Sequence, residues 1–168
     1  MFLDLDGTLW DHEDISQLHP PFQKIDDLTI VDSKGVRVRV YELMMEIMRR
    51  AAENGFILST LSWNNPEIAL QALSAFRLRD SFHYHAIEDH PRKDILALKA
   101  LRHFMQAFGC DAFKVVYIDD REIHLDDMLK VLPEACFIRA HRDFSNISEA
   151  FLRIKKCIED KGIIVLDG

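Results

Sequence analysis

The strongest constraint on this chain is a repeated pattern in which short apolar runs end in polar residues and helical segments separate them. Four such runs lie at residues 1–5, 56–61, 115–118 and 135–138. Unbroken apolar runs of this length are typical of parallel strands that are covered on both faces. The segments between them repeat apolar side chains with the 3.6-residue period of a helix, at residues 43–51, 68–73 and 95–105. We therefore expect an α/β fold with a doubly wound, Rossmann-like parallel sheet.

Local signals refine this prediction. Residues 82–86 are expected to form a further strand, and residues 146–160 a last amphipathic helix. Asn64 and Asn65 supply a cap, and Pro66 an N1 proline, for the helix that follows them. In such sheets the ligand lies outside the carboxyl ends of the strands, where the strand order reverses. The functional residues are therefore expected at the ends of the apolar runs.

Residues 10–41 break the alternation. Within them, residues 29–31 and 36–40 read as a β-hairpin, preceded by a loop that contains Pro20 and Pro21. This stretch follows the first strand directly, so we expect a small flap over the carboxyl end of that strand. No insertion is long enough for a large cap. With 168 residues, the chain is predicted to be a single domain, 1–168, that carries this flap.

Charge and cysteine content narrow the function classes. The 21 Lys and Arg against 28 Asp and Glu give a net charge of −7, without a basic block, which disfavours nucleic acid and anionic membranes as partners. No apolar run approaches the roughly 20 residues of a membrane span, and acidic residues at positions 4 and 6 argue against a signal peptide. The chain has three cysteines, Cys110, Cys136 and Cys157, and no Cys-x-x-Cys pair. This odd number predicts reduced thiols in a cytoplasmic protein.

Acidic residues follow two of the predicted strands. The first strand ends at Asp4 and Asp6, and the run at 115–118 stops at Asp119 and Asp120, so four carboxylates are expected to converge. Two like charges about 4 Å apart repel by about 4 kcal/mol at an effective dielectric constant of 20. A divalent cation would offset this repulsion. Oxygen ligands suit a hard ion, and Mg²⁺ is the usual partner where phosphate completes the coordination shell.

Residues suited to binding an anion lie beside these carboxylates. Ser62 ends the 56–61 run just before a helix start, where a hydroxyl and free backbone N–H groups form an anion site; Thr60 replaces it if the strand ends two residues earlier. Lys93, in the loop before the helix at 95–105, could bring a cation to a phosphate or to Asp4. Other cations near this position are Arg92, Lys99 and Arg121.

Taken in chain order, four motifs resemble those of the haloacid dehalogenase superfamily: Asp4-x-Asp6-Gly7-Thr8, Ser62, Lys93 and Asp119-Asp120. Within that superfamily, the chain is most similar to the magnesium-dependent phosphatase-1 family. This narrower similarity rests on the Asp-Gly-Thr-Leu-Trp start, on Pro20-Pro21-Phe22 and on the short Asp-Asp motif. Trp63 departs from the family pattern and is either an aromatic wall for a sugar or phenol ring or a packing residue.

The resemblance implies a Mg²⁺-dependent phosphatase that hydrolyses phosphomonoesters, with a phosphorylated small molecule or a phosphoprotein as substrate. Both phosphotyrosine-type substrates and sugar phosphates are compatible with it. Asp4 would be the nucleophile that forms an aspartyl-phosphate, and Asp6 the general acid and base. The metal ligands would be Asp4, Asp120 and the Asp6 carbonyl, with Asp119 a ligand or a residue that holds one. Ser62 and Lys93 would grip the phosphoryl oxygens, and Trp63 would line the substrate side.

Two other classes of function are compatible with parts of the sequence. A receiver-like or non-catalytic phosphate-binding signalling domain also uses an Asp, Mg²⁺, a hydroxyl and a lysine. A receiver, however, carries a lone Asp after its third strand, and the predicted strand at 82–86 ends without one. Zinc binding is the other alternative, because His83 and His85 share a strand face near His90, but no other residues have zinc-ligand spacing.

Overall fold

The central element is a five-stranded parallel sheet. This computed structural model describes residues 1–166, so the last two residues of the predicted 1–168 domain lie outside the described part. The strand order is β6-β5-β1-β8-β9, and each neighbouring pair is parallel. The strands are β1 (Phe2–Leu3), β5 (Ser59–Trp63), β6 (Tyr84–Glu88), β8 (Val116–Asp119) and β9 (Cys136–Arg139). The predicted doubly wound α/β fold without a large cap is confirmed.

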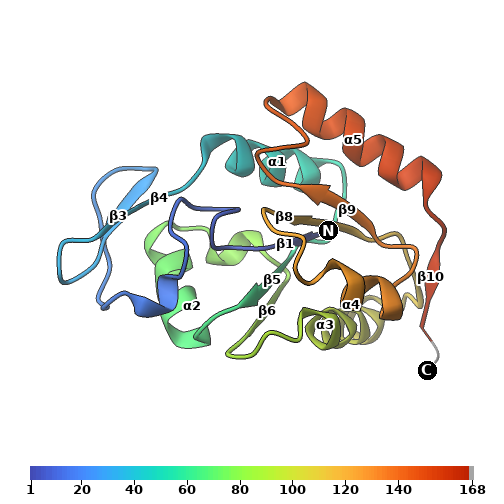
Figure 1. The fold of residues 1–168 in the computed structure, drawn as a ribbon, viewed down its shortest axis with the longest axis horizontal. Coiled ribbons are helices and arrows are strands. Elements are labelled where there is room, and N and C mark those ends of the chain that lie inside the picture. Colours follow the sequence, from blue (N-terminus) through green and yellow to red (C-terminus); the bar gives the residue numbers. More distant parts are fainter. Residues whose placement is uncertain (167–168) are drawn as a thin grey trace.

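Helices cover both faces of this sheet (Figure 1). The apolar sides of α1 (Glu42–Glu53), α2 (Pro66–Ala75) and α5 (Ile147–Asp160) contribute to one buried cluster. The apolar sides of α3 (Lys93–Phe108) and α4 (Leu125–Val131) contribute to the other. The two clusters lie on opposite sides of the sheet because side chains alternate along each strand. With both faces buried, the carboxyl edge of the sheet is left to carry polar groups.

The helix starts follow the capping signals in the sequence. The Asn65 side chain accepts a hydrogen bond from the Ile68 amide at 3.1 Å, and Pro66 is the first residue of α2. Asn146 caps α5 in the same way, because its side chain accepts from the Glu149 amide at 3.0 Å. Each cap satisfies an amide that has no partner within its helix. α2 therefore begins just beyond the end of β5.

The strand boundaries differ from the prediction: β1 is shorter, β8 and β9 are shifted by one residue, and β5 and β6 end two residues later than expected. The strand expected at 82–86 runs from Tyr84 to Glu88, because residues Arg79–Ser81 form a 3₁₀ helix, η2, just before it. β5 also continues to Trp63, which pairs in register with Glu88. β5 and β6 therefore extend two residues further than expected at the carboxyl edge of the sheet, beside β1.

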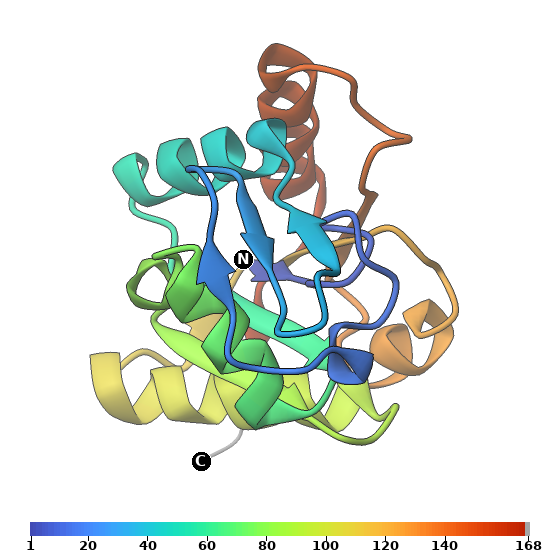
Figure 2. The same cartoon turned by 90° about the vertical axis from the view of Figure 1, so that its left-hand side faces the viewer.

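The predicted flap contains three strands where a hairpin was expected. β3 (Thr29–Val31) and β4 (Arg37–Arg39) form the hairpin, and β2 (Gln23–Lys24) adds a third antiparallel strand beside β3. Figure 2 shows this small sheet from the side that faces away from β10. β2 has no apolar alternation, so its pairing depends on β3 and is not visible in local sequence. Trp10 joins the flap to the sheet through isolated bridges to Asp6 and Val40.

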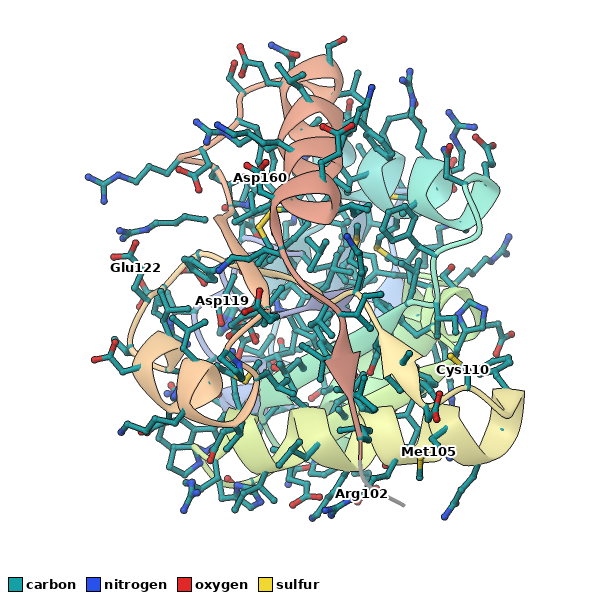
Figure 3. The ribbon with its side chains drawn as sticks, turned by 90° about the vertical axis from the view of Figure 1, so that its right-hand side faces the viewer. Arg102, Met105, Cys110, Asp119, Glu122 and Asp160 are labelled. Atoms are coloured by element: carbon teal, nitrogen blue, oxygen red, sulfur yellow. A yellow bond between two sulfur atoms is a disulfide. The ribbon has the colours of Figure 1, made fainter. Side chains whose placement is uncertain are left out.

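The expectation of three reduced thiols is wrong for two of them. Cys136 in β9 and Cys157 in α5 form a disulfide, drawn as the yellow bond near Asp160 in Figure 3. Their Cα atoms lie 5.6 Å apart, a normal spacing for this bond. The sequence separation of 21 residues gives no hint of this pairing, because packing of α5 on β9 brings the two together.

The remaining strands, β7 (Ala112–Phe113) and β10 (Ile164–Val165), form a separate antiparallel pair. Within residues 1–166, no helix has the length and apolar character that crossing a bilayer requires.

Candidate active site

The carboxyl ends of the three central strands bring the predicted site residues to one edge. Asp4 follows β1 and donates its amide to the Ile118 carbonyl at 3.0 Å, which continues the ladder with β8. Asp119 is the last residue of β8, and Ser62 lies in β5 on the other side of β1. Figure 3 labels Asp119 within the fold and Glu122 on the loop beyond it, toward solvent.

Lys93 links two of the carboxylates. It is the first residue of α3, where a loop was expected, and only 1% of its surface is exposed. Its Nζ lies 2.8 Å from Oδ1 of Asp4 and 2.7 Å from Oδ2 of Asp119. Nζ also lies 5.9 Å from the centre of the Tyr117 ring. A buried ammonium is tolerated in a protein when it is paired in this way.

The two carboxylates that share Lys93 differ in proton affinity. Burial raises the pKa of Asp4 to about 7, against the opposing effect of the Lys93 ammonium. Burial also acts to raise the pKa of Asp119, but there Lys93 prevails and the pKa is lowered. The difference has a geometric cause. Asp119 also accepts hydrogen bonds from the Tyr117 hydroxyl and the Arg121 amide, whereas Oδ2 of Asp4 is buried with no hydrogen-bond partner.

The arrangement fits a hard divalent cation. Asp4, Asp119 and Asp120 each offer a carboxylate oxygen, and these oxygens lie within 4.8 Å of one another. The partnerless, buried Oδ2 of Asp4 is a polar atom that a cation or a ligand would satisfy. Three carboxylate oxygens and no sulfur are a donor set that suits Mg²⁺.

Thr8 holds Asp120 in place. Its hydroxyl donates to Oδ1 of Asp120 at 3.1 Å and accepts from the Asp120 amide at 2.8 Å. His141 donates from Nε2 to the Thr8 carbonyl at 3.0 Å. Gly7 lies against the same carboxylate, because a Cβ atom added there would be 2.8 Å from Oδ2 of Asp120. Its φ of +67° also lies in the left-handed region that favours glycine.

Asp6 is not one of the three carboxylates that are grouped as metal ligands, although its charge acts on the buried Asp4. Its Oδ1 accepts from Nε1 of Trp10 at 2.7 Å and from the Ile15 amide at 3.2 Å. Its Oδ2 accepts from Nδ2 of Asn64 at 2.8 Å. These donors come from the flap and from the segment between β5 and α2, and they fix the orientation of the Asp6 carboxylate. Burial raises the pKa of Asp6, although the bonds from Trp10 and Asn64 act to lower it.

Ser62 and Trp63 lie at the end of β5 in different environments. Ser62 is buried, and its hydroxyl accepts from Nδ2 of Asn64 at 3.0 Å. The Ser16 hydroxyl donates to Oδ1 of Asn64 at 2.6 Å, so the Asn64 side chain has a fixed orientation. Trp63 is 47% exposed. Its indole meets the His124 ring edge-on, with centroids 6.4 Å apart.

Several side chains that position the site were missed from the sequence. Asn64 was expected only as part of a helix cap, and that cap is formed by Asn65. Ser16 carried no signal of a role, because its partner Asn64 is 48 residues away. Trp10 was noted only as part of the Asp-Gly-Thr-Leu-Trp motif and Tyr117 only as part of an apolar run, although their partners Asp6 and Asp119 are close in sequence. For Asn64 a signal did exist, since it lies two residues beyond Ser62 at a strand end.

The residues behind the two alternative functions make other contacts. His83 accepts from the Leu58 amide at 3.1 Å, and His85 lies against Phe82 with ring centroids 5.9 Å apart. In the described part of the chain, the grouped candidate metal ligands are carboxylates, and no histidine is among them. For the receiver alternative, β6 does end in an acidic residue, Glu88, where the sequence predicted a strand end without an acid. Glu88 is nevertheless paired with Lys99 at 2.7 Å, on the edge strand of the sheet.

A doubly wound sheet whose carboxyl edge holds a buried Asp-Lys-Asp cluster fits the fold and site expected for proteins of the haloacid dehalogenase type. A family model described as Acid Phosphatase matches residues 1–132, and the chain belongs to this family. Magnesium-dependent phosphatase 1 from Homo sapiens is 30% identical over 129 residues, which cover 76% of this chain and 70% of the human protein. The resemblance to haloacid dehalogenase phosphatases is therefore confirmed, and the chain is a phosphatase.

The fold has a counterpart among solved structures. The crystal structure of a putative phosphatase from Clostridium difficile superimposes with a TM-score of 0.50 at 20% identity. The match covers 69% of this chain and 54% of the other, so this chain spans about half of that structure. At this level of identity the likeness concerns the fold alone.

Proposed function

We propose that the chain is a Mg²⁺-dependent phosphomonoesterase that transfers the phosphoryl group of its substrate to Asp4. The observation that carries the proposal is the state of the Asp4 carboxylate. Lys93 holds Oδ1 at 2.8 Å, whereas Oδ2 is buried without a partner beside two further carboxylates. The name of the human relative, a magnesium-dependent phosphatase, supports the same assignment.

Asp4 and Asp120 would hold the metal with the backbone carbonyl of Asp6. Asp119 fits better as a residue that positions Lys93, because its two oxygens already accept from Lys93, Tyr117 and the Arg121 amide. When bound, Mg²⁺ supplies the positive charge that lets a phosphate dianion approach a cluster of carboxylates. Lys93 adds a second positive charge at Oδ1 of Asp4.

The side chains support a reaction in two steps. First, an oxygen of Asp4 forms a bond to phosphorus while the bond to the leaving oxygen breaks, and Asp6 gives that oxygen its proton. Next, Asp6 takes a proton from water, whose oxygen attacks phosphorus and releases Asp4. The raised pKa of Asp6 suits a group that must first carry a proton. Ser62 and Lys93 would bind the phosphoryl oxygens and keep the group in line.

The substrate is proposed to be a phosphorylated small molecule or a phosphoprotein, of either the phosphotyrosine or the sugar-phosphate type. Trp63 supports a substrate with a ring beside the phosphate, because its indole is 47% exposed at the end of β5 next to Ser62. An exposed indole gives a flat apolar surface for a phenol or a sugar face.

The test measures hydrolysis of an aryl phosphate with Mg²⁺ and with EDTA, for the wild type and for Asp4→Asn and Asp6→Asn. Asp89→Asn is the matched control, because Asp89 is exposed. We expect EDTA and Asp4→Asn to abolish turnover. Asp6→Asn should slow turnover and leave a phosphoryl group on Asp4 that mass spectrometry detects. Undiminished turnover in either variant refutes the assigned roles.

A further inference from the structure

One ring nitrogen of His124, Nε2, is buried and takes part in none of the hydrogen bonds within the described residues. The residue directly precedes α4 and is 9% exposed. A buried nitrogen without a partner is costly, so most such atoms in proteins are satisfied by other groups or by a ligand.

The position of His124 connects this atom to the active site. His124 follows Asp119 and Asp120 in the loop after β8, and it contacts Trp63 at the end of β5. β5 and β8 lie on opposite sides of β1, which carries Asp4 at its end. The contact between the two rings therefore spans the carboxyl edge at which Asp4 lies. Burial lowers the pKa of His124, and the nearby charges of Lys93 and Asp119 also act on it.

Packing against Trp63 does not by itself require the nitrogen. The two rings meet at 76° with centroids 6.4 Å apart, a geometry that a phenylalanine could also provide. An apolar ring there would leave no buried polar atom unsatisfied. His85 has a comparable atom, a buried Nδ1 without a partner, but it lies in the edge strand β6 against Phe82. Of these two histidines, His124 is thus the one whose unsatisfied atom belongs to the loop that follows Asp119 and Asp120.

We propose that His124 is a substrate-binding residue, whose Nε2–H donates a hydrogen bond to an oxygen of the phosphoryl group. Trp63 contacts the His124 ring edge-on, fixes the orientation of the imidazole and is therefore a positioning residue for His124. This inference rests on the proposed function, because it concerns the same phosphate site. It adds a neutral donor on the β8 side of the site, opposite Ser62 on β5.

Two substitutions separate this role from packing. His124→Leu keeps an apolar side chain of similar size and removes the nitrogen. His124→Gln keeps a donor at about the distance of Nε2 from the backbone. His103→Leu is the matched control. His103 is an exposed histidine of α3, and its ring packs against the ring of Tyr84 in β6 with centroids 4.6 Å apart.

The main measurement is the affinity of the Mg²⁺-loaded protein for inorganic phosphate, by titration calorimetry. A hydrogen bond to a charged group is worth about tenfold to hundredfold in affinity. We expect His124→Leu to bind phosphate that much more weakly and to raise KM for an aryl phosphate. His124→Gln should stay within a few-fold of the wild type, and His103→Leu should match it. The free energy of unfolding of His124→Leu in urea should equal or exceed that of the wild type, because an unsatisfied atom is removed.

Unchanged phosphate affinity in His124→Leu overturns the inference. If this variant does not fold, His124→Phe takes its place, since a phenyl ring keeps the contact with Trp63. The proposed function fails on a different result, namely a wild type that does not hydrolyse aryl phosphate. A wild type that is active, with a His124→Leu variant that binds phosphate equally well, refutes only the role of His124.

Discussion

Replacing Lys93 by methionine tests whether the buried charges are held together as described. Methionine keeps much of the length and volume of the lysine side chain but removes the ammonium. Asp4 and Asp119 then face each other without the cation that lies 2.8 and 2.7 Å from their oxygens in the wild type. We expect Lys93→Met to lower the free energy of unfolding of the metal-free protein.

The size of the loss follows from the charge that is left behind. Removing one partner of a buried ion pair typically costs about 3–5 kcal/mol. A second route gives a similar value. Asp119 can escape by taking up a proton, which from the ordinary aspartate pKa of about 3.9 costs about 1.36 kcal/mol per pH unit, or about 4 kcal/mol at pH 7. We therefore expect a loss of about 3–5 kcal/mol at pH 7.

The loss should depend on pH and on Mg²⁺. In the variant, the folded-state pKa of Asp119 is raised, so stability is lost as pH rises from the unfolded value toward the folded one. At pH 5 the same reasoning gives a loss of only about 1–2 kcal/mol. Mg²⁺ should stabilise the variant more than the wild type, because it restores positive charge to the cluster and binds the folded state only.

Urea unfolding, followed by circular dichroism at pH 5 and pH 7 with EDTA or Mg²⁺, measures these quantities. Lys99→Met is the control, because Lys99 is on the same helix and its ion pair with Glu88 is half exposed. An exposed pair contributes at most about 1 kcal/mol. A loss in Lys93→Met that is the same at pH 5 and pH 7 would show that packing, and not charge, is responsible, and would refute the reasoning.

Three further predictions concern the same edge of the sheet. Because the pKa of Asp4 is raised to about 7, protons compete with Mg²⁺ for this carboxylate. Calorimetry should show the Mg²⁺ affinity falling up to tenfold per pH unit below pH 7, and an affinity that does not change between pH 5 and pH 8 contradicts this. Gly7→Ala should lower the unfolding free energy by about 1–3 kcal/mol and weaken Mg²⁺ binding, because its Cβ would lie 2.8 Å from Oδ2 of Asp120 at a φ of +67°. Trp10→Phe removes the 2.7 Å bond that lowers the pKa of Asp6, so the alkaline limb of the kcat profile should move to higher pH, and an unmoved limb argues against Asp6 as the general acid.

The local sequence determined the order of strands and helices and the edge at which the site lies. Apolar run length and 3.6-residue periodicity are properties of short segments, and so are the caps at Asn65 and Asn146. The carboxyl ends of parallel strands share one edge, so Asp4, Ser62 and Asp119 could be assigned to it before their distances were known.

The tertiary structure decided which of these groups touch. Asp6 turns to Trp10 and Asn64, Lys93 bridges carboxylates from two strands, and Cys136 meets Cys157 only because α5 packs on β9. In each case at least one partner comes from a segment far away in the chain, as Asn64 does for Asp6. Side-chain direction at a strand end is set by such partners, because backbone alternation no longer constrains a residue once the strand has stopped.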